Sequence, residues 1–551
     1  MNTTTRRSSG PTHALEVAPV SPLTGLGGLL RLYGRISRRQ IIIWVLAIGL
    51  SVAASVAAMK GVYPDQQALD ARAALLENPS AVMMTGPAFA LDHYTFWAMV
   101  ANELLLYVLV AVAIMSILLM VRHTRAEEEA GRLELVRALP VGRSAPPTAA
   151  LLLVALANAG VGVSVVLGLL VTGGPLVDSL AVGLATALTG MVFGGVAALT
   201  AQVTEHAGSA SGLALGAAAV AFMVRGIGDV VDAQGSWLSW FSPFAWAQQT
   251  RLFVDLRWWP LAVTLAAILV LLGLAAVLSR RRDVGAGLRP AAHGPATATR
   301  SLPDPAGLAV RLVTPMMVAW AVGLFLFAIA FGSLANSLQD MVSEIPAVGD
   351  MVPLDLDDLT TSFAAYVLQM LAIGPLGLIV AGILRLRTEE QEGRLAGILM
   401  AGSSRTSTAV RWVLVVALST TVVQLLLGLG LGIGLLQATG ETSWLAVMPL
   451  AALAALPAIA LAGAVTVALY GLRLRLAGVA WLLVIWAAID TFLGDLLDLP
   501  DVVRSISPLR HVPLVPDADL DVSALAGMSV LAVLLVLVGL WGLRRRDLAA
   551  G

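Results

Sequence analysis

The chain has 551 residues, of which 58% are hydrophobic and 13% are charged, and its formal net charge is -1. Soluble domains are about 45 to 50% apolar and about 25% charged, so this composition excludes a water-soluble fold and predicts a protein that uses lipid as its solvent. The chain has no cysteine, which excludes disulfides, thiolate metal sites and cysteine nucleophiles. Its six histidines have no ligand-like spacing, so we predict no metal site.

Polar and basic residues precede the first apolar run. Residues 1–20 are rich in Thr, Ser and Pro, so we expect a disordered cytoplasmic tail and no cleavable signal peptide. Residues 21–40 place apolar side chains among four arginines, which favours an interfacial helix on the cytoplasmic leaflet. The alternative is that this stretch is the first part of a long first span.

Twelve segments are long and apolar enough to cross about 30 Å of hydrocarbon, which needs about 20 residues in a helix. The sequence therefore predicts an all-α integral membrane protein with about 12 transmembrane helices. The expected spans are 41–60, 97–121, 148–172, 178–201, 209–227, 259–279, 313–333, 363–384, 409–438, 446–470, 477–493 and 524–543.

The basic residues indicate how the chain is oriented. Of the 34 lysines and arginines, 27 lie on the side of the N-terminus and seven on the other side. Cytoplasmic loops carry the excess of basic residues, so both termini of this even-span protein are expected in the cytoplasm.

Three sets of residues recur in the same order in both halves of the chain. Two six-span repeats of one orientation are expected, related by a pseudo-two-fold axis along the membrane normal with a path between them. We predict a first half at 41–283, a linker rich in Pro, Ala and Gly at 284–311, and a second half at 312–551. The recurring sets are Arg125, Glu127, Glu128, Gly131, Arg132, Leu133 and Arg143 with the same residue types 262 positions later; Gly228-Asp229 and Ser242-Pro243 with Gly494-Asp495 and Ser507-Pro508; and Arg280-Arg281-Arg282-Asp283 with Arg544-Arg545-Arg546-Asp547.

The chain lacks the residues of a nucleotide-hydrolysing enzyme. A phosphate-binding loop of the Walker type needs a lysine after its glycines, and the single lysine, Lys60, lies at the outer end of the first span. We therefore predict that this chain is not an enzyme and binds no cofactor of its own.

The loop after the second span is the most informative segment. Thr124 and Glu127 have the spacing of a capping box, and Pro140 is expected to end the helix. Leu133, Val136 and Leu139 are expected on one helix face. Such an amphipathic helix below the membrane is a good contact for another protein. The alternative is a solvated helix at the membrane surface.

The pattern Glu-Glu-x-x-Gly-Arg-Leu-Glu at 127–134, followed by Pro140 and Arg143, resembles the loop between spans 2 and 3 of ABC-2 type exporter permeases. The two fused halves and the Arg-Arg-Arg-Asp endings resemble the actinobacterial tetronasin-type subgroup. This resemblance implies a multidrug or antibiotic-resistance exporter in a bacterial plasma membrane, with the transport path between its halves.

The resemblance also implies a partner. In that family the loop is a coupling helix seated on a separate ABC ATPase, which binds ATP and Mg, so two ATPase copies are expected for two loops. Glu392 replaces Ala130 and Ala396 replaces Glu134 in the second loop, so we expect the first loop to contribute more. The implied coupling residues are Glu127, Glu128, Gly131, Arg132, Leu133 and Glu134, and Glu389, Glu390, Gly393, Arg394 and Leu395.

Polar residues inside spans are candidates for a substrate path, because they are costly in lipid. Asn102, Glu103 and Tyr107 are predicted to share one face of the second span, and Gln369 matches Tyr107 in the second half. Arg225 and Asp490, near outer span ends, fit either a path or a structural role.

The leading hypothesis is an exporter permease that moves amphipathic or hydrophobic compounds, drugs or lipid-like molecules, outward by alternating access. Its partners would be the ATPase, its hydrophobic substrate and membrane lipid, with no nucleic acid. An ion-coupled twelve-span carrier is an alternative, but it predicts charges in mid-span, which are almost absent. A membrane enzyme for lipid-linked substrates is a second alternative, with Asp355, Asp357 and Asp358 as its best acidic cluster.

Overall fold

A computed structural model describes residues 21–547 apart from 77–78, 88, 233, 283–284, 289–296, 298–303, 336–357, 401 and 495–499. The chain divides into two compact units, and each is described by itself. Unit 1 comprises residues 1–70 and 85–293, and unit 2 comprises residues 71–84 and 294–551. The predicted tail at 1–20 lies outside the described residues.

Twelve helices or helix runs among the described residues are long and apolar enough to cross a membrane, which confirms the predicted twelve-span all-α fold. In unit 1 they are α1 (Leu26–Val62), α4 (Phe96–His123), α7 (Ala145–Val171), α8 (Leu176–Val203), α9 (Ala207–Val231) and α11 (Trp259–Arg280). In unit 2 they are α12 (Pro305–Gly332), α15 (Leu359–Leu371) with α16 (Ile373–Gln391), α18 (Arg405–Thr439), α19 (Trp444–Ala452) with η3 (Leu453–Ala455) and α20 (Leu456–Leu472), η4 (Leu474–Ala480) with α21 (Trp481–Leu493), and α23 (Val522–Arg545).

Short helices make up the rest of the described secondary structure. In and near the loops of unit 1 they are α5 (Arg125–Glu129), α6 (Arg132–Arg137), η1 (Leu91–His93), η2 (Ser239–Phe241) and α10 (Pro243–Gln248). In unit 2 they are α17 (Arg394–Met400), α22 (Asp501–Arg504) and η5 (Pro508–His511), while α2 (Gln66–Leu75) and α3 (Pro79–Thr85) cross the boundaries between the units.

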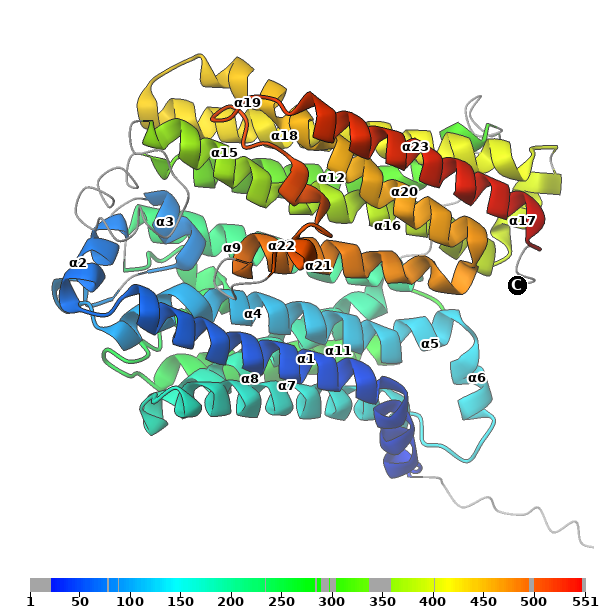
Figure 1. The fold of residues 1–551 in the computed structure, drawn as a ribbon. Coiled ribbons are helices and arrows are strands. Elements are labelled where there is room, and N and C mark those ends of the chain that lie inside the picture. The colour runs from blue at the N-terminus through cyan, green and yellow to red at the C-terminus, as the bar shows by residue number, and fades with distance from the viewer. Residues whose placement is uncertain are drawn as a thin grey trace, which may run out of the picture. The chain divides into compact units, whose positions relative to one another are not determined.

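The first helix is longer than the predicted first span. Residues 21–40 were expected as a separate interfacial helix, but α1 runs as one helix from Leu26 to Val62, as in the alternative of a long first span. Its darkest blue turns nevertheless bend away from the rest of the helix (Figure 1). Whether those turns lie on a leaflet stays a prediction.

In unit 1, α1 packs against α7, α4 and α7 pack against α8, and α8 packs against α11 (Figure 1). Small residues bring these backbones together, as is usual between membrane helices. A Cβ atom on Gly162 of α7 would lie 2.7 Å from the carbonyl oxygen of Gly183 of α8, so this contact requires glycine.

In unit 2 the corresponding spans are paired in the same way. α12 packs against α18, α16 packs against α20, and α20 packs against α23 (Figure 1). A Cβ atom on Gly332 of α12 would lie 2.5 Å from the carbonyl oxygen of Leu431 of α18. The internal repeat therefore extends from the sequence to the packing inside each unit, while the pseudo-two-fold axis between the units stays a prediction.

Several helices of unit 2 depart from the predicted spans. The predicted span 363–384 is divided at Ala372 between α15 and α16, with Pro375 just after the break. The predicted span 446–470 has Pro449 inside α19 and a 3₁₀ turn before α20. Proline lacks the N–H that a helix interior needs, so breaks occur here. α12 begins at Pro305, inside the predicted linker, because the Asp304 side chain accepts the N–H of Ala306 and caps it.

Candidate functional site: two coupling loops and the polar groups of the spans

Each candidate coupling loop is built as two helical pieces joined at a glycine. Unit 1 has α5 and α6 joined at Gly131, and unit 2 has α16 and α17 joined at Gly393. The two glycines have φ angles of +70° and +74°, in the left-handed region that side chains disfavour. The repeat of this glycine in the sequence therefore reflects the same turn in both units.

Two details of the predicted loop helix are wrong. The loop is not one helix but two, because the chain turns at Gly131. Thr124 makes no capping hydrogen bond. Its hydroxyl donates instead to the carbonyl oxygen of Met120 at 2.6 Å, so α5 begins without a capping box.

An arginine after the glycine reaches back across the turn in both loops. Arg132 donates from Nε and Nη2 to the Glu127 carboxylate at 2.8 and 2.9 Å, and Arg394 donates to Glu389 at 2.6 and 2.8 Å. The hydrogen bonds that each arginine donates to its glutamate raise the pKa of that arginine above the ordinary value. Both arginines are half exposed. The pair therefore clamps the glycine turn and is common to both loops.

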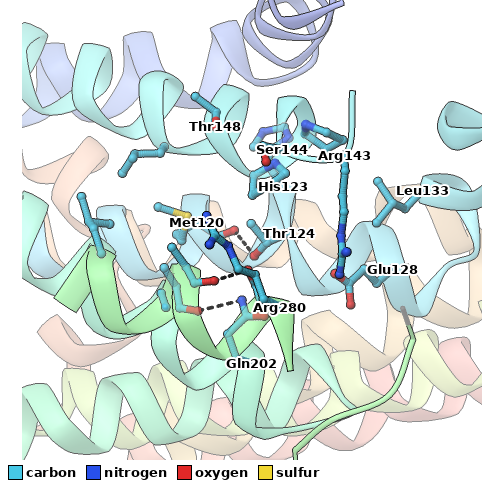
Figure 2. A pocket seen from close by; sticks show the side chains of 18 of the residues that line it. Met120, His123, Thr124, Glu128, Leu133, Arg143, Ser144, Thr148, Gln202 and Arg280 are labelled. Atoms are coloured by element: carbon cyan, nitrogen blue, oxygen red, sulfur yellow. Dashed lines mark hydrogen bonds between the residues drawn. The ribbon is translucent and has the colours of Figure 1, made fainter. Parts of the chain in front are cut away.

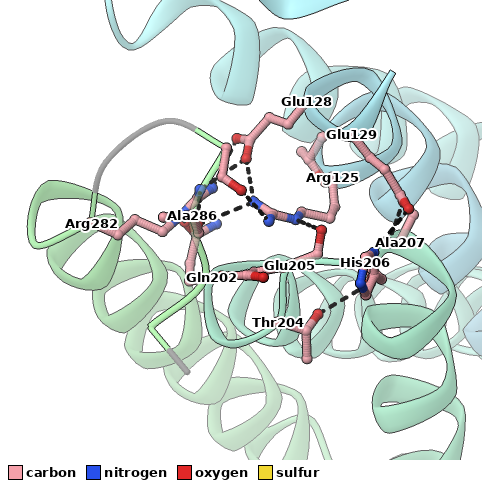
Figure 3. Close-up of polar contacts among 12 residues, drawn as sticks. Arg125, Glu128, Glu129, Gln202, Thr204, Glu205, His206, Ala207, Arg282 and Ala286 are labelled. Carbon is pink, nitrogen blue, oxygen red and sulfur yellow. Dashed lines mark hydrogen bonds and ion pairs between the residues drawn. The ribbon is translucent and has the colours of Figure 1, made fainter. Parts of the chain in front are cut away.

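The second glutamate of the unit 1 loop is buried in an ion-pair network (Figure 3). Arg282, just after α11, donates to both oxygens of Glu128 at 2.8 Å and to Gln202 Oε1 at 2.7 Å. Arg125, only 1% exposed, donates to Glu128 at 2.6 Å and to the carbonyl oxygens of Glu205 and Gly285 at 2.9 and 2.7 Å. This network joins the loop to the ends of α8 and α11.

The third glutamate of the same loop holds a different helix. Glu129 accepts the backbone N–H of Ala207 at 2.8 Å and lies 3.1 Å from Nδ1 of His206, at the start of α9 (Figure 3). A carboxylate suits the first turn of a helix because free N–H groups point toward it. The position of Glu129 is Gln391 in the second loop, so this contact is a feature of unit 1.

Unit 2 repeats the buried glutamate pair. Arg546, just after α23, donates from Nη2 to Glu390 at 2.6 Å, and the Tyr470 hydroxyl donates to the same carboxylate at 2.6 Å. Although burial alone lowers the pKa of Arg546, the hydrogen bonds and charge of Glu390 leave it raised. The acidic loop motif and the terminal Arg-Arg-Arg-Asp motif are therefore bonded partners in each unit. Sequence analysis found both motifs as repeats but missed that they meet.

These contacts change the expected role of the motif. The carboxylates of Glu128, Glu389 and Glu390 are nearly buried within their own unit, as are Leu133 and Leu395. They hold the loops in place and present little surface to another protein.

The loops also expose large apolar residues that lie outside the shared motif. Leu135 is 73% exposed, Leu139 is 60% exposed and Met400 is 84% exposed. Leu139 was expected on the same face as Leu133, but α6 ends at Arg137 and the chain leaves helical geometry before Leu139. Glu134 and its counterpart Ala396 are exposed, as a contact role requires.

The three candidate path residues of unit 1 do not share one face. The buried Asn102 amide donates to the carbonyl oxygens of Gly86 and Pro87 at 3.3 and 3.4 Å, whereas Tyr107 is 51% exposed. Glu103 is half-buried. Asn102 therefore anchors the segment before α4. Tyr107 is the most exposed residue of this set and could contact a substrate directly.

Gln369 has an anchoring contact in unit 2. Its amide donates to the carbonyl oxygens of Leu509 and Val512 at 2.8 and 3.4 Å, which fastens the segment around η5 to α15. A role in a substrate path stays a prediction for Gln369, as it does for Asn102, Glu103 and Tyr107.

The charged residues near the outer span ends are paired within their units. Arg225 and Asp229 of α9 are fully buried with Nη1 and Oδ2 3.3 Å apart, and Ser239 donates to Asp229 at 2.6 Å. In unit 2, Arg504 donates to Asp490 at 2.9 Å. Ionised groups that are buried away from water are usually paired with an opposite charge in this way. The acidic cluster considered for an enzyme gains no support, because Asp358 caps α15 through the Thr361 N–H and Asp355 and Asp357 lie outside the described residues.

Twelve apolar helices, internal ion pairs and two matched loops define a multi-pass integral membrane protein built from related units. Over 534 residues, or 96% of each chain, it is 35% identical to the multidrug efflux system permease protein Rv1217c of Mycobacterium tuberculosis (strain ATCC 25618 / H37Rv). Residues 302–544 match the family described as multidrug efflux system permease Rv1217c, C-terminal domain. The chain belongs to this family of efflux system permeases. The predicted resemblance is confirmed to that extent, and membership of the ABC-2 type exporters and of their tetronasin-type subgroup stays a prediction.

Proposed function

We propose that this chain is the membrane subunit of an ATP-driven exporter that moves amphipathic or hydrophobic compounds out of the cell. Two copies of a separate ABC ATPase would supply the energy, with ATP and Mg bound in that partner. The observation that carries the proposal is the same clamped, anchored loop in each unit. The multidrug efflux role of the Mycobacterium tuberculosis relative supports the substrate class.

The loops are suited to transmit motion because they are rigidly joined to spans. Glu128 ties the first loop to the end of α11 through Arg282, and Glu390 ties the second to the end of α23 through Arg546. Each loop is also continuous with the span before it, since α5 follows α4 and α17 follows α16. A displacement of either loop would therefore shift two spans of its unit, which is what alternating access needs.

Leu135 and Leu139 form the contact surface proposed for the ATPase in the first loop, and Met400 contributes to the second. These side chains are exposed and lie outside the membrane spans. Covering such apolar surface with a partner protein removes it from water and therefore favours binding. The first loop offers two leucines and Glu134, so it is proposed to carry the larger share of the interface.

The double variant Leu135→Ser with Leu139→Ser tests this assignment. Losing two buried leucines from an interface costs about 2 kcal/mol or more, so ATPase affinity should fall by about thirtyfold or more. Affinity is measured by titrating purified ATPase into the permease in nanodiscs. Val502→Ser with Leu520→Ser is the control, since both residues are exposed and apolar in unit 2 outside the spans. Equal affinity for the parent and the loop variant would refute docking at this surface.

A further inference from the structure

A pocket of about 440 Å³ lies within unit 1, at the end of the helices that carries the coupling loop (Figure 2). The ends of α4, α8 and α11 and the start of α7 surround it, and Leu133 of α6 contributes to its wall. The volume falls within the range of small-molecule sites, about 300 to 1,000 Å³.

One side of this pocket is apolar and borders the lipid-facing surface. Leu151 of α7 and Leu272 and Ala276 of α11 line it. Ala276 is exposed at the surface of unit 1, and Leu151 and Leu272 are half-buried. An acyl chain in the surrounding lipid could therefore enter the pocket from the membrane.

Three cations also line this pocket. Arg137, Arg143 and Arg280 line it, and all three are exposed. None of their side chains makes a hydrogen bond or ion pair with a described residue, in contrast to Arg282, which is committed to Glu128. Arg143 and Arg280 are labelled in Figure 2 among the residues that line the pocket. Three uncompensated guanidinium groups around one concavity fit an anion with several oxygen atoms.

The equivalent positions of unit 2 lack this arrangement. Leu399 stands where unit 1 has Arg137. Arg405 donates to the carbonyl oxygen of Arg546 at 3.0 Å, and Arg544 donates to the Thr406 hydroxyl at 3.2 Å. The free cations are therefore a property of the first unit and not a general consequence of the repeat.

We propose that this pocket binds one anionic phospholipid from the adjoining leaflet. Its phosphate would lie among Arg137, Arg143 and Arg280, and part of an acyl chain would lie against Leu151 and Ala276. Basic pockets between membrane helices bind anionic headgroups in this way, and the apolar wall adds the affinity of the chain. Because Glu128 and Leu133 also line the pocket, the lipid would contact the anchored base of the coupling loop.

Native mass spectrometry of the full chain, without any ATPase, tests the site with phosphatidylglycerol, phosphatidylcholine and soluble glycerol phosphate. The parent should bind one phosphatidylglycerol more tightly than phosphatidylcholine. Each arginine near an anionic lipid contributes about a factor of five, so Arg137→Gln, Arg143→Gln and Arg280→Gln together should weaken phosphatidylglycerol binding by about a hundredfold. The control Arg281→Gln, Arg405→Gln and Arg544→Gln removes the same charge outside the pocket and should leave that binding unchanged.

A second variant separates a lipid from a free phosphate. Ala276→Trp fills the apolar side with all three arginines intact, so it should abolish the tight phosphatidylglycerol binding while binding of glycerol phosphate stays weak in both proteins. Two results would overturn the proposal: phosphatidylglycerol binding that survives the triple arginine variant, or glycerol phosphate that binds as tightly as the lipid and is indifferent to Ala276→Trp. Because no ATPase is present, neither result bears on the coupling proposal.

Discussion

At the scale of single residues, three adjacent glutamates in one loop have three different partners. Glu127 clamps the glycine turn through Arg132, Glu128 is shared by Arg125 and Arg282, and Glu129 holds the start of α9. The burial of these ion pairs differs as well. The side chains of Glu128 and Arg282 are nearly buried, whereas Arg132, the partner of Glu127, is half exposed. Removing one member of a buried pair costs about 3 to 5 kcal/mol, and losing an exposed pair costs about 0 to 1.

Glu128→Gln is therefore expected to destabilise unit 1 by about 3 kcal/mol, because it leaves two buried guanidinium groups without a carboxylate. Glu127→Gln next to it should cost no more than about 1 kcal/mol. Thermal unfolding in detergent compares the two directly, and the double variant Glu128→Gln with Arg282→Gln should recover part of the loss. Equal unfolding temperatures for the two single variants would contradict the buried role of Glu128.

At the scale of elements, each loop follows a span and is pinned to the end of the last span of its unit. Within each unit, this arrangement places the arginine-rich end of the last span and the loop at the same end of the helices. The distribution of basic residues predicts that this end is cytoplasmic.

The absence of cysteine makes the orientation directly testable. Ser144 precedes α7 beside the first loop, Ser443 precedes α19 at the other end of α18, and both are exposed. A membrane-impermeant maleimide added to intact cells should label Ser443→Cys and should label Ser144→Cys only after permeabilisation. The reverse pattern would invert the predicted topology.

At the scale of the whole molecule, two units with matched loops predict that two copies of one ATPase bind the chain. ATP hydrolysis by these copies is then the expected energy source for transport. Purified alone, the chain should hydrolyse no ATP, because its single lysine, Lys60, donates to the Thr172 carbonyl oxygen at 2.6 Å and serves no phosphate loop.

With its cognate ATPase, the chain should form a complex of one permease to two ATPases in native mass spectrometry. In inverted vesicles that contain this complex, uptake of a hydrophobic fluorescent dye should require ATP and persist when a protonophore collapses the proton gradient. Uptake that follows the proton gradient without ATP would favour the ion-coupled carrier considered from the sequence.

The sequence by itself determined the solvent, the number of spans and the repeat. Those features depend on composition and on runs of about 20 apolar residues, which are local properties and survive errors of a few residues at each boundary. It also located the loops, because the motif around Gly131 recurs around Gly393 at a constant offset of 262 residues.

Only the tertiary structure decided what the loop residues do. Glu128 and Arg282 are far apart in the chain and meet because α4 and α11 both pack against α8, so neither helical periodicity nor a motif could pair them. The same packing buries Leu133 and exposes Leu135. It also brings Arg137, Arg143 and Arg280 to one pocket, where their side chains have no hydrogen-bond or ion-pair partner among the described residues. Burial and charge compensation arise from neighbours distant in sequence, which is why a linear reading found the residues but not their roles.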